Sequence, residues 1–302
     1  MEPRLNYFIA GAPKCGTTSL FYYLTQHPNV YDPGYKEVNY FCEDFPTLRN
    51  KKDLASYQQL FSRVSATDLA IGEASVAYLY SATAPRLIHE MNPDARIILM
   101  VRDPTDLVYS LHMQLLSTLN EVETDFEKAW ALQDERAQGR LIPQKCTEPF
   151  FLQYREIGRL GKYLQRMLDV FPADQVKVIF YDDFKTQTLV EYESVLKFLE
   201  LPPFPDVELQ VLNVSHANRS ELLAHLIDRV AKSGPGRQLG ELKKRLPMGK
   251  VDLYESLRNL NRKKSPRKPL SPQFKVSLRQ EFAEDVRLLA QLTGRNLDQW
   301  SA

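Results

Sequence analysis

A short segment near the N-terminus has the composition of a phosphate-binding loop: residues 11–19 read Gly-Ala-Pro-Lys-Cys-Gly-Thr-Thr-Ser. The apolar run 5–10, typical of a buried strand, precedes it, and a helical pattern at 17–26 follows. A glycine-containing loop between a strand and a helix presents free backbone N–H groups and the positive end of the helix dipole. The segment therefore predicts an anion site at the start of the helix.

The loop departs from that of ATP- and GTP-binding P-loop enzymes. Gly11 and Gly16 keep the glycine spacing, but Thr17 stands where the lysine after the second glycine belongs, and the loop's lysine is Lys14. A kinase needs its lysine and Mg²⁺ on the β- and γ-phosphates. A donor with one 5′-phosphosulfate instead needs a single cation near the bridging oxygen, where charge develops. Lys14 suits this second chemistry, for which we expect no metal.

Residues 13–20 resemble the 5′-phosphosulfate-binding loop of the sulfotransferases that use 3′-phosphoadenosine-5′-phosphosulfate (PAPS). Weaker motifs extend the resemblance over roughly residues 5–300, and it is closer to the carbohydrate, heparan-sulfate-like and bacterial members than to the cytosolic phenol and steroid enzymes. The resemblance implies PAPS as donor and 3′,5′-adenosine bisphosphate (PAP) as product. The donor-binding residues expected in this loop are Lys14, Cys15, Gly16, Thr17, Thr18 and Ser19.

A second anion site is expected after the apolar run 96–101. Arg102 leaves the end of this run, and Ser110 lies eight residues later, in a helix expected to begin at Pro104. A dianionic phosphate can accept a fork of hydrogen bonds from a guanidinium and another from a hydroxyl. The pair resembles the family's 3′-phosphate motif.

Two further donor contacts come from the resemblance alone. Tyr181, at the end of a strand expected at 176–181, occupies the place of a tyrosine near the adenine. Arg267 and Lys268 belong to a basic stretch where the family has a late loop that closes over the 3′-phosphate.

Sulfuryl transfer also needs a general base, because the attacking group must lose its proton. The segment 35–41 resembles the Lys-Glu-x-His-Phe-Phe segment of the carbohydrate enzymes, which implies Glu37 as the base. Asn39 stands where some relatives have histidine, and Ala74 where they have a second lysine. The alternative base is His112, two residues after Ser110, because the phenol and steroid enzymes use a histidine.

Apolar runs alternate with helical patterns along the chain. Strands are expected at 5–10, 96–101 and 176–181, with a short fourth at 69–72, and a last helix should run from Pro272 to about Leu292. This alternation predicts an α/β, P-loop-like three-layer fold with a mostly parallel central sheet and helices on both faces.

Composition sets the remaining limits. The 302 residues are 43% hydrophobic and 25% charged with a net charge of +1, which favours no nucleic-acid partner. We expect one sulfotransferase domain, 1–302, with a basic lid-like segment at about 232–270. No apolar run reaches the length of a membrane span, and three scattered cysteines favour a reducing compartment. We expect a cytoplasmic protein, or the soluble domain of a longer one.

The sequence thus predicts in-line transfer of a sulfuryl group from PAPS to a hydroxyl or amine of a carbohydrate or small-molecule acceptor. Two alternatives stay open at this point: another P-loop transferase such as an ATP- and Mg²⁺-dependent kinase, and a catalytically inactive nucleotide-binding protein. Neither the acceptor nor the oligomeric state can be inferred from these residues.

Overall fold

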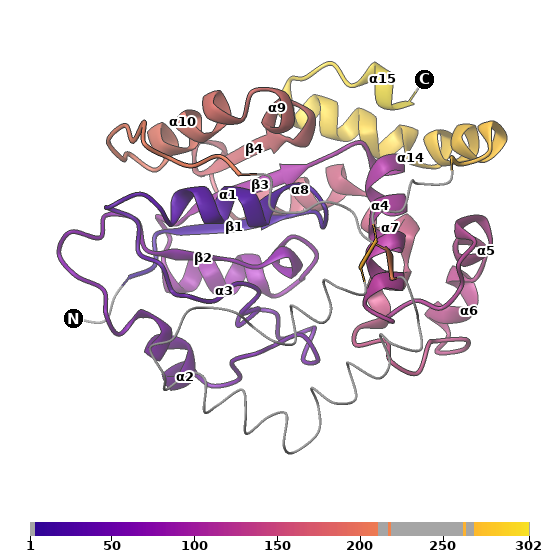
Figure 1. Ribbon diagram of the computed structural model, residues 1–302, viewed down its shortest axis with the longest axis horizontal. Helices are drawn as coiled ribbons and strands as arrows, with labels where there is room; N and C mark the ends of the chain where they lie inside the picture. The colour runs from indigo at the N-terminus through magenta and orange to yellow at the C-terminus, as the bar shows by residue number, and fades with distance from the viewer. Residues whose placement is uncertain (1–3, 211–216, 219–261, 264–268, 302) are drawn as a thin grey trace.

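The computed structural model describes residues 4–210, 217–218, 262–263 and 269–301 (Figure 1). Its centre is a four-stranded sheet in the order β2-β1-β3-β4, in which every neighbouring pair is parallel. The strands are β1 (Tyr7–Gly11), β2 (Gly72–Ala74), β3 (Arg96–Val101) and β4 (Val176–Phe180). All five residues of β1 are buried, as expected for a central strand covered on both faces.

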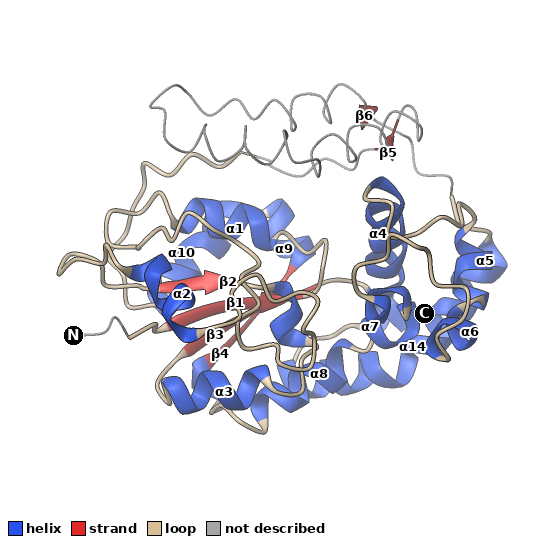
Figure 2. Ribbon diagram, turned by 90° about the horizontal axis from the view of Figure 1, so that it is seen from below, coloured by secondary structure: helices blue, strands red, loops and turns tan. Residues whose placement is uncertain are grey.

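Helices cover both faces of this sheet (Figure 2). Helices α1 (Thr17–Leu24), α9 (Tyr181–Thr186) and α10 (Thr188–Phe198) lie on one side, and α3 (Ala84–Met91) and α8 (Leu160–Leu168) on the other. The predicted α/β fold class, a parallel sheet between two helical layers, is confirmed.

The remaining elements surround this centre. The helices are α2 (Leu54–Gln58), α4 (Pro104–Ser117), α5 (Phe126–Ala131), α6 (Gln133–Ala137), α7 (Tyr154–Ile157), α14 (Pro272–Thr293) and α15 (Asp298–Ser301). Short 3₁₀ turns are η1 (Gln59–Phe61), η2 (Val76–Leu79), η3 (Pro149–Leu152) and η4 (Ala173–Gln175). Strands β5 (Ala217–Asn218) and β6 (Arg262–Lys263) form a separate antiparallel pair.

Most expected elements are present, with shifted ends. The run 96–101 is β3, and Ser271 caps α14 by accepting a hydrogen bond from the Phe274 amide at 3.3 Å. The fourth strand lies later than expected, at Gly72–Ala74, where Gly72 allows a close approach to β1: a Cβ there would lie 2.0 Å from the Tyr7 carbonyl oxygen. The strand expected to end at Tyr181 ends at Phe180, because Tyr181 begins α9.

The parallel register brings the carboxyl ends of all four strands to one edge of the sheet. Ile9 of β1 lies opposite Ala74 of β2 and Ile98 of β3. The segments that follow the strands therefore start side by side, which is where open α/β sheets bind ligands.

Candidate active site

The phosphate loop follows β1 and turns sharply into α1. Lys14 has a φ of 65° and Gly16 a φ of 91°, so the chain is left-handed at two points within three residues. Gly16 occupies the N-cap of α1, no side chain caps this end, and the first turn contains no acidic residue. Amides at an uncapped helix start can donate hydrogen bonds to an anion, and the anion site expected here stays a prediction.

Glycine is required at position 16 for two reasons. Its φ of 91° is one that residues with a side chain rarely adopt. A Cβ would also lie 3.1 Å from two ring carbons of Phe184, in α9. The turn is thus held tightly between α1 and α9.

Arg102, from the second expected anion site, contacts the phosphate loop, which is the first. It follows β3, is nearly buried, and donates from Nη1 to the Lys14 carbonyl at 3.5 Å. Its Nη2 pairs with Asp106 of α4 at 3.2 Å, and its Cζ lies 4.7 Å from the ring centroid of Tyr181. The structure therefore brings the phosphate loop, Arg102 and Tyr181 together from three strand ends.

Part of the Arg102 guanidinium still lacks a hydrogen bond. Its Nε is buried and has no acceptor within the described part of the chain. A buried guanidinium N–H without a partner is costly, and a phosphate oxygen would satisfy it. Ser110, two turns into α4, is also buried.

The other expected donor contacts divide into two groups. Thr17 and Ser19 are buried at the start of α1, and Thr18 is half-buried. Arg267 and Lys268, with most of the basic segment expected at 232–270, lie outside the described residues.

Glu37 lies at the carboxyl end of β2, beside the phosphate loop's strand. Its Oε1 pairs with Lys36, and its Oε2 accepts a hydrogen bond from the Val76 amide at 2.9 Å. Its side chain is 40% exposed and lines a pocket of about 300 Å³. The full lining is Glu37, Asn39, Thr47, Leu48, Asn50, Val76, Ala77, Thr147 and Phe151. The carboxylate is therefore accessible to a small acceptor.

Comparison with known proteins assigns the chain to a family. A family model described as a sulfotransferase domain matches residues 5–290. The chain belongs to the sulfotransferase family. Among solved structures, a sulfotransferase from Alicyclobacillus acidocaldarius has a TM-score of 0.70 and 26% identity, covering 99% of this chain and 100% of that one. A mouse sulfotransferase complexed with PAP, 14% identical with a TM-score of 0.51 and covering 99% and 90%, shares the fold.

Two curated relatives have names that refer to sugars. Human heparan sulfate glucosamine 3-O-sulfotransferase 5 is 28% identical over 198 residues, 65% of this chain and 53% of that protein. Human carbohydrate sulfotransferase 15 is 24% identical over 263 residues, 71% of this chain and 47% of that protein. The chain thus spans about half the length of these curated relatives.

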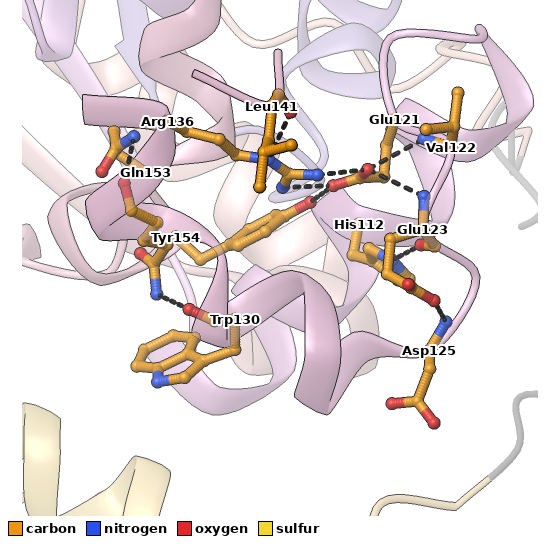
Figure 3. A network of polar contacts seen from close by, with 11 residues as sticks. His112, Glu121, Val122, Glu123, Asp125, Trp130, Arg136, Leu141, Gln153 and Tyr154 are labelled. Atoms are coloured by element: carbon orange, nitrogen blue, oxygen red, sulfur yellow. Dashed lines mark hydrogen bonds and ion pairs between the residues drawn. The ribbon is translucent and has the colours of Figure 1, made fainter. Parts of the chain in front are cut away.

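His112 lies beside a polar network that includes Glu121, Arg136 and Tyr154 (Figure 3). Its ring has no exposed surface, and Nε2 donates to the Glu123 carbonyl at 2.8 Å. The ring packs against Phe126 and Tyr154, and Nδ1 is buried without a partner in the described chain. Burial lowers the pKa of His112, so the ring is neutral near pH 7.

Sequence reasoning missed a buried carboxylate behind the Glu37 segment. Glu73, in β2, has no exposed surface and accepts hydrogen bonds from the hydroxyls of Tyr57 at 2.8 Å, Tyr78 at 2.7 Å and Ser75 at 2.7 Å. The sequence signal is the Gly-Glu pair at 72–73, which resembles a family segment, but the three hydroxyl partners come from separate elements.

Neither a metal cluster nor a membrane helix is found in the described part of the chain. No three or more His, Cys, Asp or Glu residues group there as a metal site would require. Within the same residues, every helix is too short or too polar to cross a bilayer. The thiol of Cys15 is buried, and burial raises its pKa to about 12, so it is not a nucleophile at neutral pH.

Proposed function

We propose that this chain transfers a sulfuryl group from PAPS to a hydroxyl or amine of a carbohydrate or small-molecule acceptor. The observation that carries the proposal is the position of Arg102, within 3.5 Å of the Lys14 carbonyl and over the Tyr181 ring. Two anion sites and an aromatic ring are thereby adjacent, as a nucleotide with phosphates at both its 3′ and 5′ positions requires. The names of the curated relatives support a glycan among the acceptors.

The residues present fit this donor. The amides at Gly16–Ser19, at the uncapped end of α1, would hold the 5′-phosphosulfate. Arg102, whose Nε lacks a partner in the described chain, and Ser110 would hold the 3′-phosphate, and Tyr181 would lie near the adenine. Binding at these remote groups would fix the position of the reacting centre.

PAPS supplies the sulfuryl group. Glu37, which lines the pocket, accepts the proton of the attacking hydroxyl or amine. Lys14 stabilises the negative charge that develops on the departing bridging oxygen. We assign the base to Glu37 and not to His112, because Glu37 is accessible and His112 has no exposed surface.

Calorimetric titration with PAP and with ATP, each with and without Mg²⁺, tests the donor. Tight PAP binding that does not depend on Mg²⁺ is expected, and Mg²⁺-dependent ATP binding in its place would favour the kinase alternative. A transfer screen with radiolabelled PAPS across glycans, lipids and hydroxylated or amine metabolites then tests the reaction. PAP binding without transfer to any acceptor would favour the inactive nucleotide-binding alternative.

Lys14→Ala tests the leaving-group role. Turnover should fall by about 10²–10³, as when one oxyanion donor is lost, while Lys185→Ala, at an exposed lysine of α9, should leave it unchanged. Near-normal turnover of Lys14→Ala would remove Lys14 from the mechanism. The single domain, the basic lid, the metal-independent chemistry and the cytoplasmic location stay predictions.

A further inference from the structure

The loop that carries Glu37 has an unusual backbone. Glu37 has a φ of 60° and Asn39 a φ of 54°. Asparagine tolerates this left-handed region, but glutamate rarely occupies it, and the conformation costs about 1–2 kcal/mol. Such a conformation persists only where the surroundings hold it, and it concentrates at functional sites.

Three hydrogen bonds fix this loop to the end of β2. The Glu37 amide donates to the Ala74 carbonyl at 2.8 Å, and the Val76 amide donates to the Glu37 carboxylate at 2.9 Å. Between them, the Asn39 amide donates to the Ser75 hydroxyl oxygen at 3.0 Å. Two of the three partners are backbone groups of the strand end, and the third is a side chain.

A hydrogen bond to the buried Glu73 carboxylate orients the Ser75 hydroxyl. It donates its hydrogen to Glu73 Oε2 at 2.7 Å, so its lone pairs are left to accept from Asn39. Tyr57 and Tyr78 both donate to the other oxygen, Oε1, which holds the carboxylate in place. The Ser75 amide is itself bonded to the Ile9 carbonyl of β1 at 3.0 Å.

We propose that Glu73 and Ser75 are positioning residues for sulfuryl transfer: the Glu73 carboxylate orients the Ser75 hydroxyl, which holds the Asn39 amide and with it the left-handed turn that presents Glu37. This inference rests on the proposed function, in which Glu37 is the base. Neither positioning residue is exposed, so neither touches the acceptor. In this proposal, the hydrogen bonds of the buried Glu73 carboxylate define the geometry of the base, Glu37.

Ser75→Ala tests the relay, with two controls. Tyr57→Phe removes another hydroxyl from the same carboxylate without breaking the link to Asn39. Ser81→Ala removes a second fully buried serine hydroxyl, whose hydrogen bonds run to Asp44 and the Ala84 amide rather than to Glu73 or Asn39. Ser75→Cys keeps the shape of the side chain but places a larger sulfur there, which is a weak donor and a weak acceptor, and it is the conservative variant.

With radiolabelled PAPS and the best acceptor of the wild-type screen, Ser75→Ala should lower kcat by about 10-fold or more, since misplacing a catalytic group by 1 Å can cost about 10²-fold. The KM for PAPS should not change, and Ser75→Cys should be intermediate. Tyr57→Phe should lower kcat less than Ser75→Ala does, because Tyr78 and Ser75 still bond the Glu73 carboxylate. Ser81→Ala should keep the wild-type kcat. Equal losses of kcat in Ser75→Ala and Tyr57→Phe would overturn the proposal, because a merely structural cluster predicts equal effects.

Hydrogen exchange gives a readout that does not depend on activity. The Asn39 amide should exchange at least about 10-fold faster in Ser75→Ala, relative to the Ile98 amide of β3. The increase should be smaller in Tyr57→Phe and absent in Ser81→Ala. Unchanged relative exchange would also overturn the relay. A wild-type protein that transfers no sulfuryl group would instead refute the proposed function, and the exchange result would still report on the relay.

Discussion

The regions around Glu37 and around His112 each contain a candidate base and a buried carboxylate, but they are built differently. Beside Glu37, Glu73 accepts three hydroxyl hydrogen bonds, and no cation pairs with it within the described chain. Beside His112, Glu121 forms two 2.7 Å hydrogen bonds to Arg136 and accepts further ones from Tyr154 and from two backbone amides (Figure 3).

The pKa values of the two buried carboxylates move in opposite directions. Burial raises the pKa of Glu73, and its three hydroxyl partners oppose this only in part. Burial also acts on Glu121, but the hydrogen bonds from Arg136, the Glu123 amide and Tyr154 outweigh it and lower the pKa. Glu121 is thus paired with a cation, whereas Glu73 is bonded by hydroxyls, and the carboxylate with the raised pKa is the one behind the Glu37 loop.

Replacing Glu37 should have the largest effect on turnover. Glu37→Gln keeps the shape of the side chain but cannot accept a proton, so kcat should fall by about 10²–10⁴. The affinity for PAP, measured by titration, should stay at the wild-type value because the phosphate groups are bound elsewhere. Wild-type kcat in this variant would remove the functional distinction between the two regions.

Replacing Glu121 should have the largest effect on folding. Glu121→Gln leaves the Arg136 guanidinium buried without an anion, which should cost about 3–5 kcal/mol of the free energy of unfolding. Glu73→Gln should lower the free energy of unfolding by less, because it leaves no buried cation without an anion among the described residues. Urea denaturation measures both. The control is Glu135→Gln, in the exposed pair with Arg140, which should change the free energy of unfolding little because solvent screens this pair. A loss at Glu121 no larger than the control would contradict the contrast.

The proximity of residues 11–19 to Arg102 could be predicted from sequence because its signals are local. The phosphate loop is one contiguous segment, and Arg102 directly follows an apolar strand. Parallel strand order then brings the two together, as general rules for α/β sheets require. The fold class and the limits of β3 and α14 were predictable for the same reason.

The support for Glu37 could not be predicted in this way. The hydroxyls around Glu73 come from α2, η2 and the end of β2, and their convergence depends on tertiary packing. The burial of His112 was equally hidden, because its helix has no strong polar or apolar face in the sequence; the ring is enclosed by Phe126 and Tyr154, which follow it in the chain. The end of β4 was placed one residue late because Tyr181 has strand propensity but begins α9.

The opposite pKa shifts predict opposite responses to acid. Glu121, whose pKa is lowered, stabilises the fold above the pKa of an unfolded glutamate, about 4.3, and this contribution is lost as pH falls through its folded value. Glu73, whose pKa is raised, is better accommodated when protonated, so the fold gains stability as pH falls from the raised value toward about 4.3.

Urea denaturation of the wild type and of both glutamine variants, between about pH 7 and pH 3, separates these contributions. The stability of the wild type relative to Glu73→Gln should rise as the solution is acidified toward about pH 4.3. Relative to Glu121→Gln it should hold steady over that range and then fall. Parallel curves for the two variants would show that the carboxylates have similar environments.

Replacing His112 should have the smallest effect. His112→Phe keeps an aromatic ring among Phe126 and Tyr154, loses one hydrogen bond to the Glu123 carbonyl, and removes an Nδ1 that is buried without a partner in the described chain. The two changes oppose each other, so the free energy of unfolding should stay within about 1 kcal/mol of the wild type. Turnover should be unchanged, because a neutral ring with no exposed surface cannot reach an acceptor. A loss of kcat as large as that of Glu37→Gln, in a variant that folds normally, would make His112 the base and reverse the roles of the two regions.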